Sequence, residues 1–405
     1  MGAVQERLRS YGLGAALALA IVVLAFLYPQ YVESLGDAPL VGDFIPGLGS
    51  MVIMIVFTMM AVGLNIVVGY AGLLDLGYVA FYAAGAYTSA WFASQQFDQW
   101  TFHFGSVGIS KEVPGIHLSI WLVLLIAGIF TALTGILIGL PTLRLRGDYL
   151  AIVTLGFGEI IPQVVRNGDN VFGFDLTHGT FGISPIDSPG FGSVGESIGL
   201  PLSFQQSFDR AQWFYWTALA LLLLTVFCSV RLRDSRLGRA WIAIREDETA
   251  AAAMGVPLMR TKTWSYAIGA FFGGVAGAFY ASFKSGAFPA DFYFNISVFL
   301  LCMVILGGMG SIWGVILGGM ILGYLNVEGL ATLGSELQEA GIDFDPTKYQ
   351  FGFYGVIIVL MMLFRPTGLI PERRHKREME LGVADTPLYD VTSEGADTDR
   401  EPRND

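Results

Sequence analysis

Three polar residues lie inside otherwise apolar stretches of this sequence, where they could guide a polar solute. They are Asn65, Asp75 and Glu159. An ionisable side chain inside a membrane is costly, so it usually faces a water-filled path or a partner. All three are therefore candidates for a translocation path, although Asn65 is interpreted first as a hydrogen-bonding residue between helices.

Glu159 has the most informative surroundings. It lies between Gly158 and Pro162, and Gly156 precedes it. The backbone is predicted to depart there from a regular helix and to present amide groups. A zwitterion could bind these amides, or Glu159 itself could bond them. Asp75 follows a glycine-rich turn and is consistent with either a path residue or a side chain at the membrane interface.

The sequence shows no pattern typical of catalysis or of a metal site. Its four histidines and two cysteines lack the spacings of metal ligands or of a catalytic dyad, and the histidines are interpreted as ordinary loop residues. None of the lysines follows a glycine, so the Gly-Lys core of a nucleotide-binding P-loop is missing. We predict that the chain is not an enzyme, needs no cofactor, and leaves ATP binding to other proteins.

The elements that must position these residues are membrane helices. Of the 405 residues, 54% are hydrophobic and 14% are charged, and the mean hydropathy is +0.58. Because a membrane span needs about 20 mostly apolar residues, the sequence predicts an all-α polytopic membrane protein with about ten transmembrane helices. Their windows are 12–28, 51–68, 73–92, 118–140, 149–165, 213–230, 264–282, 294–306, 312–324 and 351–364.

The basic residues predict the orientation. With ten spans, 18 of the 23 Lys and Arg residues lie on one side of the membrane, together with both termini. Cytoplasmic loops carry the excess of Lys and Arg, so both termini are predicted to be cytoplasmic. The opposite face is acidic, and nothing on it resembles the basic footprint of a nucleic-acid-binding protein.

The predicted organisation is a transmembrane domain over residues 1–371 and a disordered cytoplasmic tail over 372–405. The tail is polar and of mixed charge. A long extracytoplasmic loop covers 166–212, and a cytoplasmic loop covers 231–262. Glycines predict broken helices near 156–162 and 307–314, and breaks at matching places of two halves often line a binding site.

The cytoplasmic loop 231–262 is too long for a mere connection. Asp247 is predicted to cap a short helix with four alanines at 250–253, and Gly255 to end it. Alanines let another surface approach closely. Trp241, Ile242, Ile244 and Met254 would be costly to leave in water, so a partner protein or the bilayer interface is expected to cover them.

Several strings of this sequence resemble one family. The string GRAWIAIREDETAAAAMGV at 238–256 looks like the coupling loop of branched-chain amino acid ABC transporter permeases of the LivM type. Further similar strings are GLNIVVGYAGLLDLGYVAFYAAGAY at 63–87, LRLRGDYLAIVTLGFGEII at 143–161 and GGMGSIWGVILGG at 307–319. The chain departs from the family pattern in its acidic tail and its extended loops.

The resemblance implies a subunit of a prokaryotic cell (inner) membrane importer. Its partners would be a homologous permease subunit, two ATP-binding cassette subunits that bind the ATP, an extracytoplasmic substrate-binding protein and membrane lipid. The residues implied for contact with the ATPase are Gly238, Arg239, Ala240, Arg245, Glu246, Glu248, Ala252 and Gly255.

Two other functions stay open at this point. A urea or short-amide ABC permease would have similar loops. An ion-coupled secondary transporter would use intramembrane carboxylates such as Asp75 and Glu159 as coupling sites.

Overall fold

The computed structural model describes residues 20–32, 44–106, 112–145, 147–171, 173–190 and 207–371. Within these ranges, eight helices are long and apolar enough to cross a membrane, which confirms the all-α polytopic class. The two remaining windows, 12–28 and 73–92, overlap the shorter helices Ala20–Val32 and α3 (Val79–Phe92), and residues 12–19 lie outside the described ranges. The predicted tail at 372–405 lies outside the described residues.

The elements follow a simple alternation of long helices and short connections. In chain order they are α2 (Leu48–Asn65), the π-helix η2 (Ile66–Tyr70), α3 (Val79–Phe92), β1 (Ala93–Ser94), β2 (Thr101–Phe104), β3 (Gly115–Leu118), α4 (Ile120–Thr142), α5 (Asp148–Arg166), η3 (Gly179–Phe181), α7 (Ser207–Asp234), α8 (Arg236–Glu246), α9 (Glu248–Ala253), α10 (Leu258–Lys284), η4 (Pro289–Asp291), α11 (Phe294–Gly307), α12 (Ile312–Tyr324), the π-helix η5 (Leu325–Gly329), α13 (Leu330–Glu339), η6 (Pro346–Tyr349) and α14 (Gln350–Phe364).

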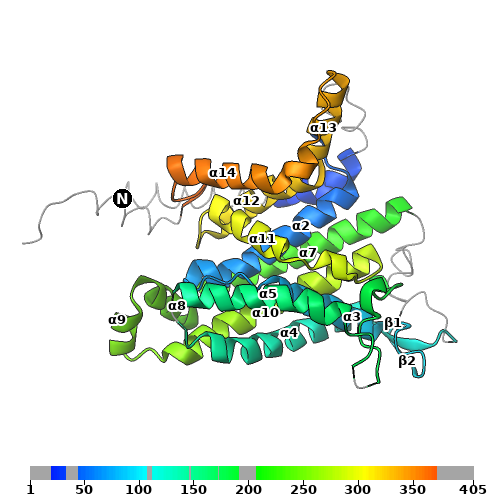
Figure 1. Ribbon diagram of the computed structural model, residues 1–405, viewed down its shortest axis with the longest axis horizontal. Coiled ribbons are helices and arrows are strands. Elements are labelled where there is room, and N and C mark those ends of the chain that lie inside the picture. Colours follow the sequence, from blue (N-terminus) through cyan, green and yellow to red (C-terminus); the bar gives the residue numbers. More distant parts are fainter. Residues whose placement is uncertain are drawn as a thin grey trace, which may run out of the picture.

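The long helices run between two different ends of the molecule (Figure 1). Helices α8 and α9 lie at one end, which we call the α8–α9 end. The other end, the sheet end, carries a three-stranded sheet of order β1-β3-β2, in which β3 is antiparallel to β1 and parallel to β2. Helices α8 and α9 and the sheet therefore lie at opposite ends of the bundle.

Helix α10 forms the centre of the bundle and packs against α4, α3 and α2. Glycines permit this close approach. A Cβ atom at Gly85 of α3 would collide with the Gly274 carbonyl oxygen, and one at Gly277 would collide with the Tyr82 carbonyl oxygen. Small residues at membrane helix interfaces let backbones touch, and dispersion contacts then hold the helices together.

The predicted break near Glu159 is wrong. Helix α5 is continuous from Asp148 to Arg166 with Pro162 inside it. The small size of Gly158 has another purpose, because a Cβ atom there would lie 3.2 Å from the Leu76 carbonyl oxygen of a neighbouring segment. The glycines at 307–310 join two helices instead of breaking one, and Gly308 (φ +112°) and Gly310 (φ +87°) form the reversal between α11 and α12.

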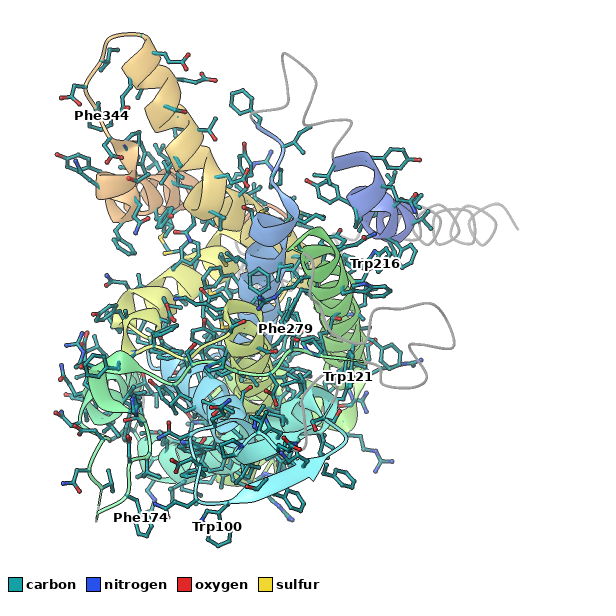
Figure 2. All side chains as sticks on the ribbon, turned by 90° about the vertical axis from the view of Figure 1, so that its right-hand side faces the viewer. Trp100, Trp121, Phe174, Trp216, Phe279 and Phe344 are labelled. Atoms are coloured by element: carbon teal, nitrogen blue, oxygen red, sulfur yellow. The ribbon has the colours of Figure 1, made fainter. Side chains whose placement is uncertain are left out.

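The helix Ala20–Val32 is held to α7 through its backbone. The Tyr215 hydroxyl donates to the Ala25 carbonyl oxygen at 2.6 Å, and the Trp216 indole donates to the Phe26 carbonyl oxygen at 3.2 Å. The Trp216 ring also stacks on Phe26. Figure 2 shows Trp216 at this contact, on the outside of the bundle, whereas Phe279 lies at its centre.

Candidate functional site

The α8–α9 end carries a helix whose cap was predicted correctly. The Asp247 carboxylate accepts hydrogen bonds from the amides of Thr249 at 2.8 Å and Ala250 at 3.0 Å, and so caps α9. The hydroxyl bond from Thr249, followed by these amides, lowers the pKa of Asp247, so the cap stays ionised and complements the helix dipole. Gly255, at φ +85°, allows the chain to leave the helix.

One face of α9 is left uncovered by the described residues. Ala252, Ala253 and Gly255 are exposed, and Met254 is 85% exposed. The expectation that Trp241 and Ile244 also need an external cover is wrong. Both are buried within the chain, where the Trp241 indole donates to the Thr261 carbonyl oxygen at 2.8 Å. The α9 face, with Met254 at its end, is therefore the most exposed apolar part of this loop, and Met259 adds to it at 37% exposure.

The other residues predicted on this loop differ in exposure. Gly238 is buried, and it packs so closely on the end of α7 that a Cβ atom there would strike the carbonyl oxygens of that helix. Arg239 is exposed and donates to the Asp234 carbonyl oxygen at 2.9 Å. Ala240 is half-buried and Glu246 is exposed. Gly238 thus positions α8, whereas Arg239 and Glu246 lie at the surface.

Two charged side chains anchor the loop to the bundle. Glu248 pairs with Lys262 of α10 at 2.9 Å, and the Lys262 side chain is only 4% exposed. Arg245 donates to the Gly69 carbonyl oxygen of η2. Beside both lies a cavity of about 300 Å³, lined in part by Gly72, Leu74, Arg245, Glu248 and Lys262. Lys262 was not singled out in the sequence, because nothing local distinguishes a buried lysine from the other basic residues of the loop.

Asn65 and Asp75 lie close to this anchor and are buried. The Asn65 side-chain oxygen accepts from the Gly310 amide at 2.9 Å, which confirms its predicted role between helices. Asp75 is 1% exposed. One of its carboxylate oxygens accepts from the Gly77 amide at 2.8 Å, and the other has no hydrogen-bond partner among the described residues.

Glu159, unlike the buried Asn65 and Asp75, lies at the surface of the chain. It is exposed on α5, a helix otherwise apolar enough to span a membrane. The two regions are nevertheless connected, because the Leu76 amide donates to Thr154 of α5 at 3.0 Å. A carboxylate that faced lipid would cost about 3 kcal/mol on insertion scales. This side of α5 is therefore better suited to a partner subunit or a polar path than to lipid.

The sheet end carries a cleft of about 730 Å³. Its lining includes Gln96, Trp100, Phe174, Asp175 and His178, and Figure 2 shows Trp100 and Phe174 at the outer edge of the molecule. The loop that follows α5 is fastened there, since the side-chain amide of Gln96 donates to the Asp175 carbonyl oxygen at 3.0 Å. Amide, carboxylate and aromatic groups together suit a protein surface better than a lipid surface.

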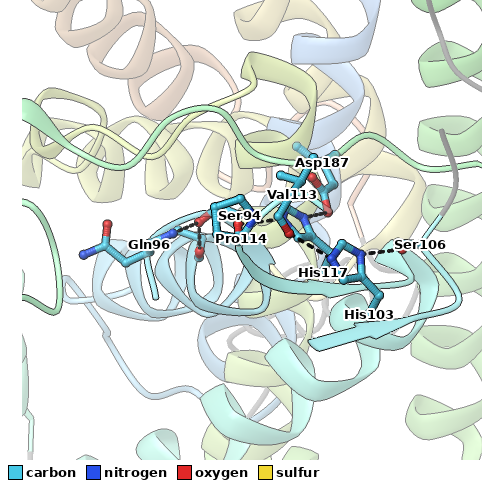
Figure 3. A network of polar contacts seen from close by, with 10 residues as sticks. Ser94, Gln96, His103, Ser106, Val113, Pro114, His117 and Asp187 are labelled. Carbon is cyan, nitrogen blue, oxygen red and sulfur yellow. Dashed lines mark hydrogen bonds and ion pairs between the residues drawn. The ribbon is translucent and has the colours of Figure 1, made fainter. Parts of the chain in front are cut away.

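All four histidines were predicted to be ordinary loop residues, and for two of them this is wrong. His103 and His117 belong to β2 and β3, and their rings stack at 4.9 Å between centroids (Figure 3). One nitrogen of His117 lies 2.8 Å from the Asp187 carboxylate and the other lies 3.3 Å from the Pro114 carbonyl oxygen. Asp187 is distant in sequence from both strands, so no local spacing could have revealed the cluster.

This cluster predicts a pH dependence of stability. Burial raises the pKa of Asp187 from 3.8 to about 6, although the bond to His117 opposes the shift. The folded protein then holds a proton that the unfolded chain releases, so the stability contributed by Asp187 is lost as pH rises from about 4 to about 6. We expect the thermal midpoint of purified protein to fall over this range, and the fall to be smaller in Asp187→Asn. An equal fall in the variant would assign the effect to other groups.

Comparisons with known proteins agree with this architecture. The family model described as the permease component of the branched-chain amino acid transport system matches residues 48–362. The chain is 36% identical over 380 residues to the high-affinity branched-chain amino acid transport system permease protein LivM of Escherichia coli, covering 90% of this chain and 77% of that protein.

More distant relatives extend the similarity. A probable LivM of Methanocaldococcus jannaschii is 30% identical over 65% of this chain and 71% of its own length. The LivH permease protein of Escherichia coli is 28% identical over 52% of this chain and 64% of its own length. No solved structure matches the chain.

The fold, its membrane-spanning helices and the match over residues 48–362 lead to one conclusion. The chain belongs to the family of permease components of branched-chain amino acid transport systems.

Proposed function

We propose that this chain is one of two permease subunits of an ATP-driven importer for branched-chain amino acids, with the α8–α9 end in the cytoplasm. The observation that carries the proposal is the α9 face, which is capped, apolar and exposed at one end of a membrane bundle. A surface of this kind fits a groove on another protein. Similarity to both LivM and LivH supports a pair of related permeases.

In this proposal the chain holds no ATP and no other cofactor. Two ATP-binding cassette subunits bind the α9 face, around Ala252 and Gly255. When these subunits close, they move the loop 231–262, and the loop moves the membrane helices. Residues 1–371 form the permease domain, and both termini are cytoplasmic. The cleft at the sheet end faces outward and receives the substrate-binding protein.

The path is proposed to lie between the two permeases, along the side of α5 that carries Glu159. Glu159 is exposed in this single chain but sits on a helix of membrane-span length. Asp75 and Asn65 lie near the cytoplasmic exit, under the loop 231–262. Such a path needs no intramembrane metal or covalent chemistry, because import follows from alternating exposure of one site.

Reconstitution tests this function directly. The chain, its companion permease, the ATPase subunits and the binding protein are placed in liposomes, and uptake of labelled leucine is measured with and without ATP. Uptake that requires ATP and every component is the expected result.

Competition and omission distinguish the alternatives. Excess isoleucine and valine should suppress leucine uptake, whereas urea and acetamide should not. Suppression by urea would assign the chain to an amide importer instead. Leucine uptake by this chain alone, driven by a proton or sodium gradient without ATP, would overturn the proposal in favour of an ion-coupled transporter.

A further inference from the structure

Three backbone segments meet at Gly69, the fourth residue of the π-helix η2. Arg245, in the last turn of α8, donates to the Gly69 carbonyl oxygen. On the other side, a Cβ atom at Gly69 would lie 2.6 Å from the amide nitrogen of Gly310, in the turn between α11 and α12. Gly69 is therefore enclosed between the loop 231–262 and the α11–α12 turn, and no larger residue fits there.

The π-helix is fastened to the α11–α12 turn by a second contact. The Asn65 side-chain oxygen accepts from the Gly310 amide at 2.9 Å, and both residues are buried. Single π-helical turns are uncommon and occur often at functional sites, because they hold a helix in an alternative hydrogen-bond register. A displacement of η2 would therefore move the α11–α12 turn with it.

The chain that follows η2 extends the connection to α5. The Leu76 amide bonds Thr154, and the Asp75 carboxylate bonds the Gly77 amide. Gly158 packs against the carbonyl oxygen of Leu76. Segment 71–77 is thus held between η2 and the helix that carries Glu159.

The loop 231–262 has room to move relative to η2. The cavity of about 300 Å³ lies between the loop and segment 71–74. The stem of Arg245 packs across this gap, since a Cβ atom at Gly72 would lie 2.7 Å from the Arg245 Cγ. The ion pair of Glu248 with Lys262 ties α9 to α10.

We propose that Arg245 is the positioning residue that passes movement of the loop 231–262 to η2, and through η2 to the α11–α12 turn and α5. The proposal rests on the function proposed above and names the internal connection that this function requires. An arginine suits the role because its guanidinium presents several fixed donors to one carbonyl while its stem fills the approach to Gly72.

The test separates ATP hydrolysis from transport in the complete complex. Arg245→Met keeps a stem of similar length but removes the donors, and Arg245→Lys restores a charged donor. Arg236→Ala is the matched control, since Arg236 is exposed on the same helix. For each complex, ATP hydrolysis and leucine uptake are measured in the same liposomes, and assembly is checked by size-exclusion chromatography.

Arg245→Met is expected to assemble and hydrolyse ATP at close to the unaltered rate, while leucine imported per ATP hydrolysed falls about tenfold. Loss of a charge-assisted hydrogen bond has an effect of this size. Arg245→Lys should recover part of the loss, and Arg236→Ala should leave the ratio unchanged.

Two results would overturn the role of Arg245. One is an unchanged uptake-to-hydrolysis ratio in Arg245→Met. The other is a parallel loss of assembly, hydrolysis and uptake that Arg245→Lys does not recover, which would make Arg245 a folding residue. Failure of the unaltered complex to import leucine with ATP is distinct from both and would instead refute the proposed function.

Discussion

Ala252→Arg is expected to abolish ATP-driven leucine uptake by the complete complex, with a loss of at least about 100-fold. Ala252 is exposed on α9, beside Met254 and Gly255. On the proposed docking surface an arginine would place a bulky, unpaired charge in a closely packed interface, and such burial costs roughly 3 kcal/mol or more. The measurement is co-purification of the ATPase subunits with the variant, together with uptake in liposomes.

The control for this prediction is an equally exposed alanine at another place. Ala340, at the end of α13, is exposed, and Figure 1 shows α13 projecting away from the bundle, far from α8 and α9. Ala340→Arg should retain the ATPase subunits. Because Ala252 is exposed, its replacement should leave the thermal midpoint of the isolated chain unchanged. Full ATPase binding and uptake by Ala252→Arg would place the docking surface elsewhere.

Gly277→Val is expected to remove most of the folded protein. At this position α10 touches α3 so closely that a Cβ atom would collide with the Tyr82 carbonyl oxygen. A backbone oxygen cannot turn aside as a side chain can, so the two central helices must separate. Overpacking usually costs about 1–3 kcal/mol and more where the backbone must shift. The yield of monodisperse protein in detergent and its thermal midpoint are the measurements.

Gly355→Val is the matched control, because a Cβ atom at Gly355 of α14 would meet nothing within 4 Å. It should leave both quantities close to those of the unaltered chain. A similar loss in the two variants would show that valine in a membrane helix, instead of the α3–α10 contact, causes the effect. Normal stability of Gly277→Val would mean that these helices lie farther apart in the membrane.

Features that depend on neighbours in sequence could be predicted well. Apolar windows located the long helices because a membrane sets their length. The cap of α9 could be predicted because the amides that donate to Asp247 belong to residues only two and three positions further along the chain. Gly255 was placed correctly for the same local reason, since its positive φ follows directly from the end of the helix.

Features that depend on partners far apart in sequence could not be predicted. Trp241 resembled an uncovered surface residue, yet it is buried and bonds the start of α10, twenty residues later. The contact of Asn65 with Gly310 spans 245 residues, and only the folded chain brings them together. The region of Glu159 shows the opposite error, because Gly156 and Pro162 were interpreted as a helix break although α5 continues through both.

The attachment of the helix Ala20–Val32 has an evolutionary consequence. Tyr215 and Trp216 donate to carbonyl oxygens, which every amino acid possesses, so these two bonds tolerate changes in the side chains of the helix while it remains helical and apolar. Selection should therefore fall on the two aromatic donors of α7 and on the rings that they contact, Phe26 and Tyr28, more heavily than on the rest of the segment.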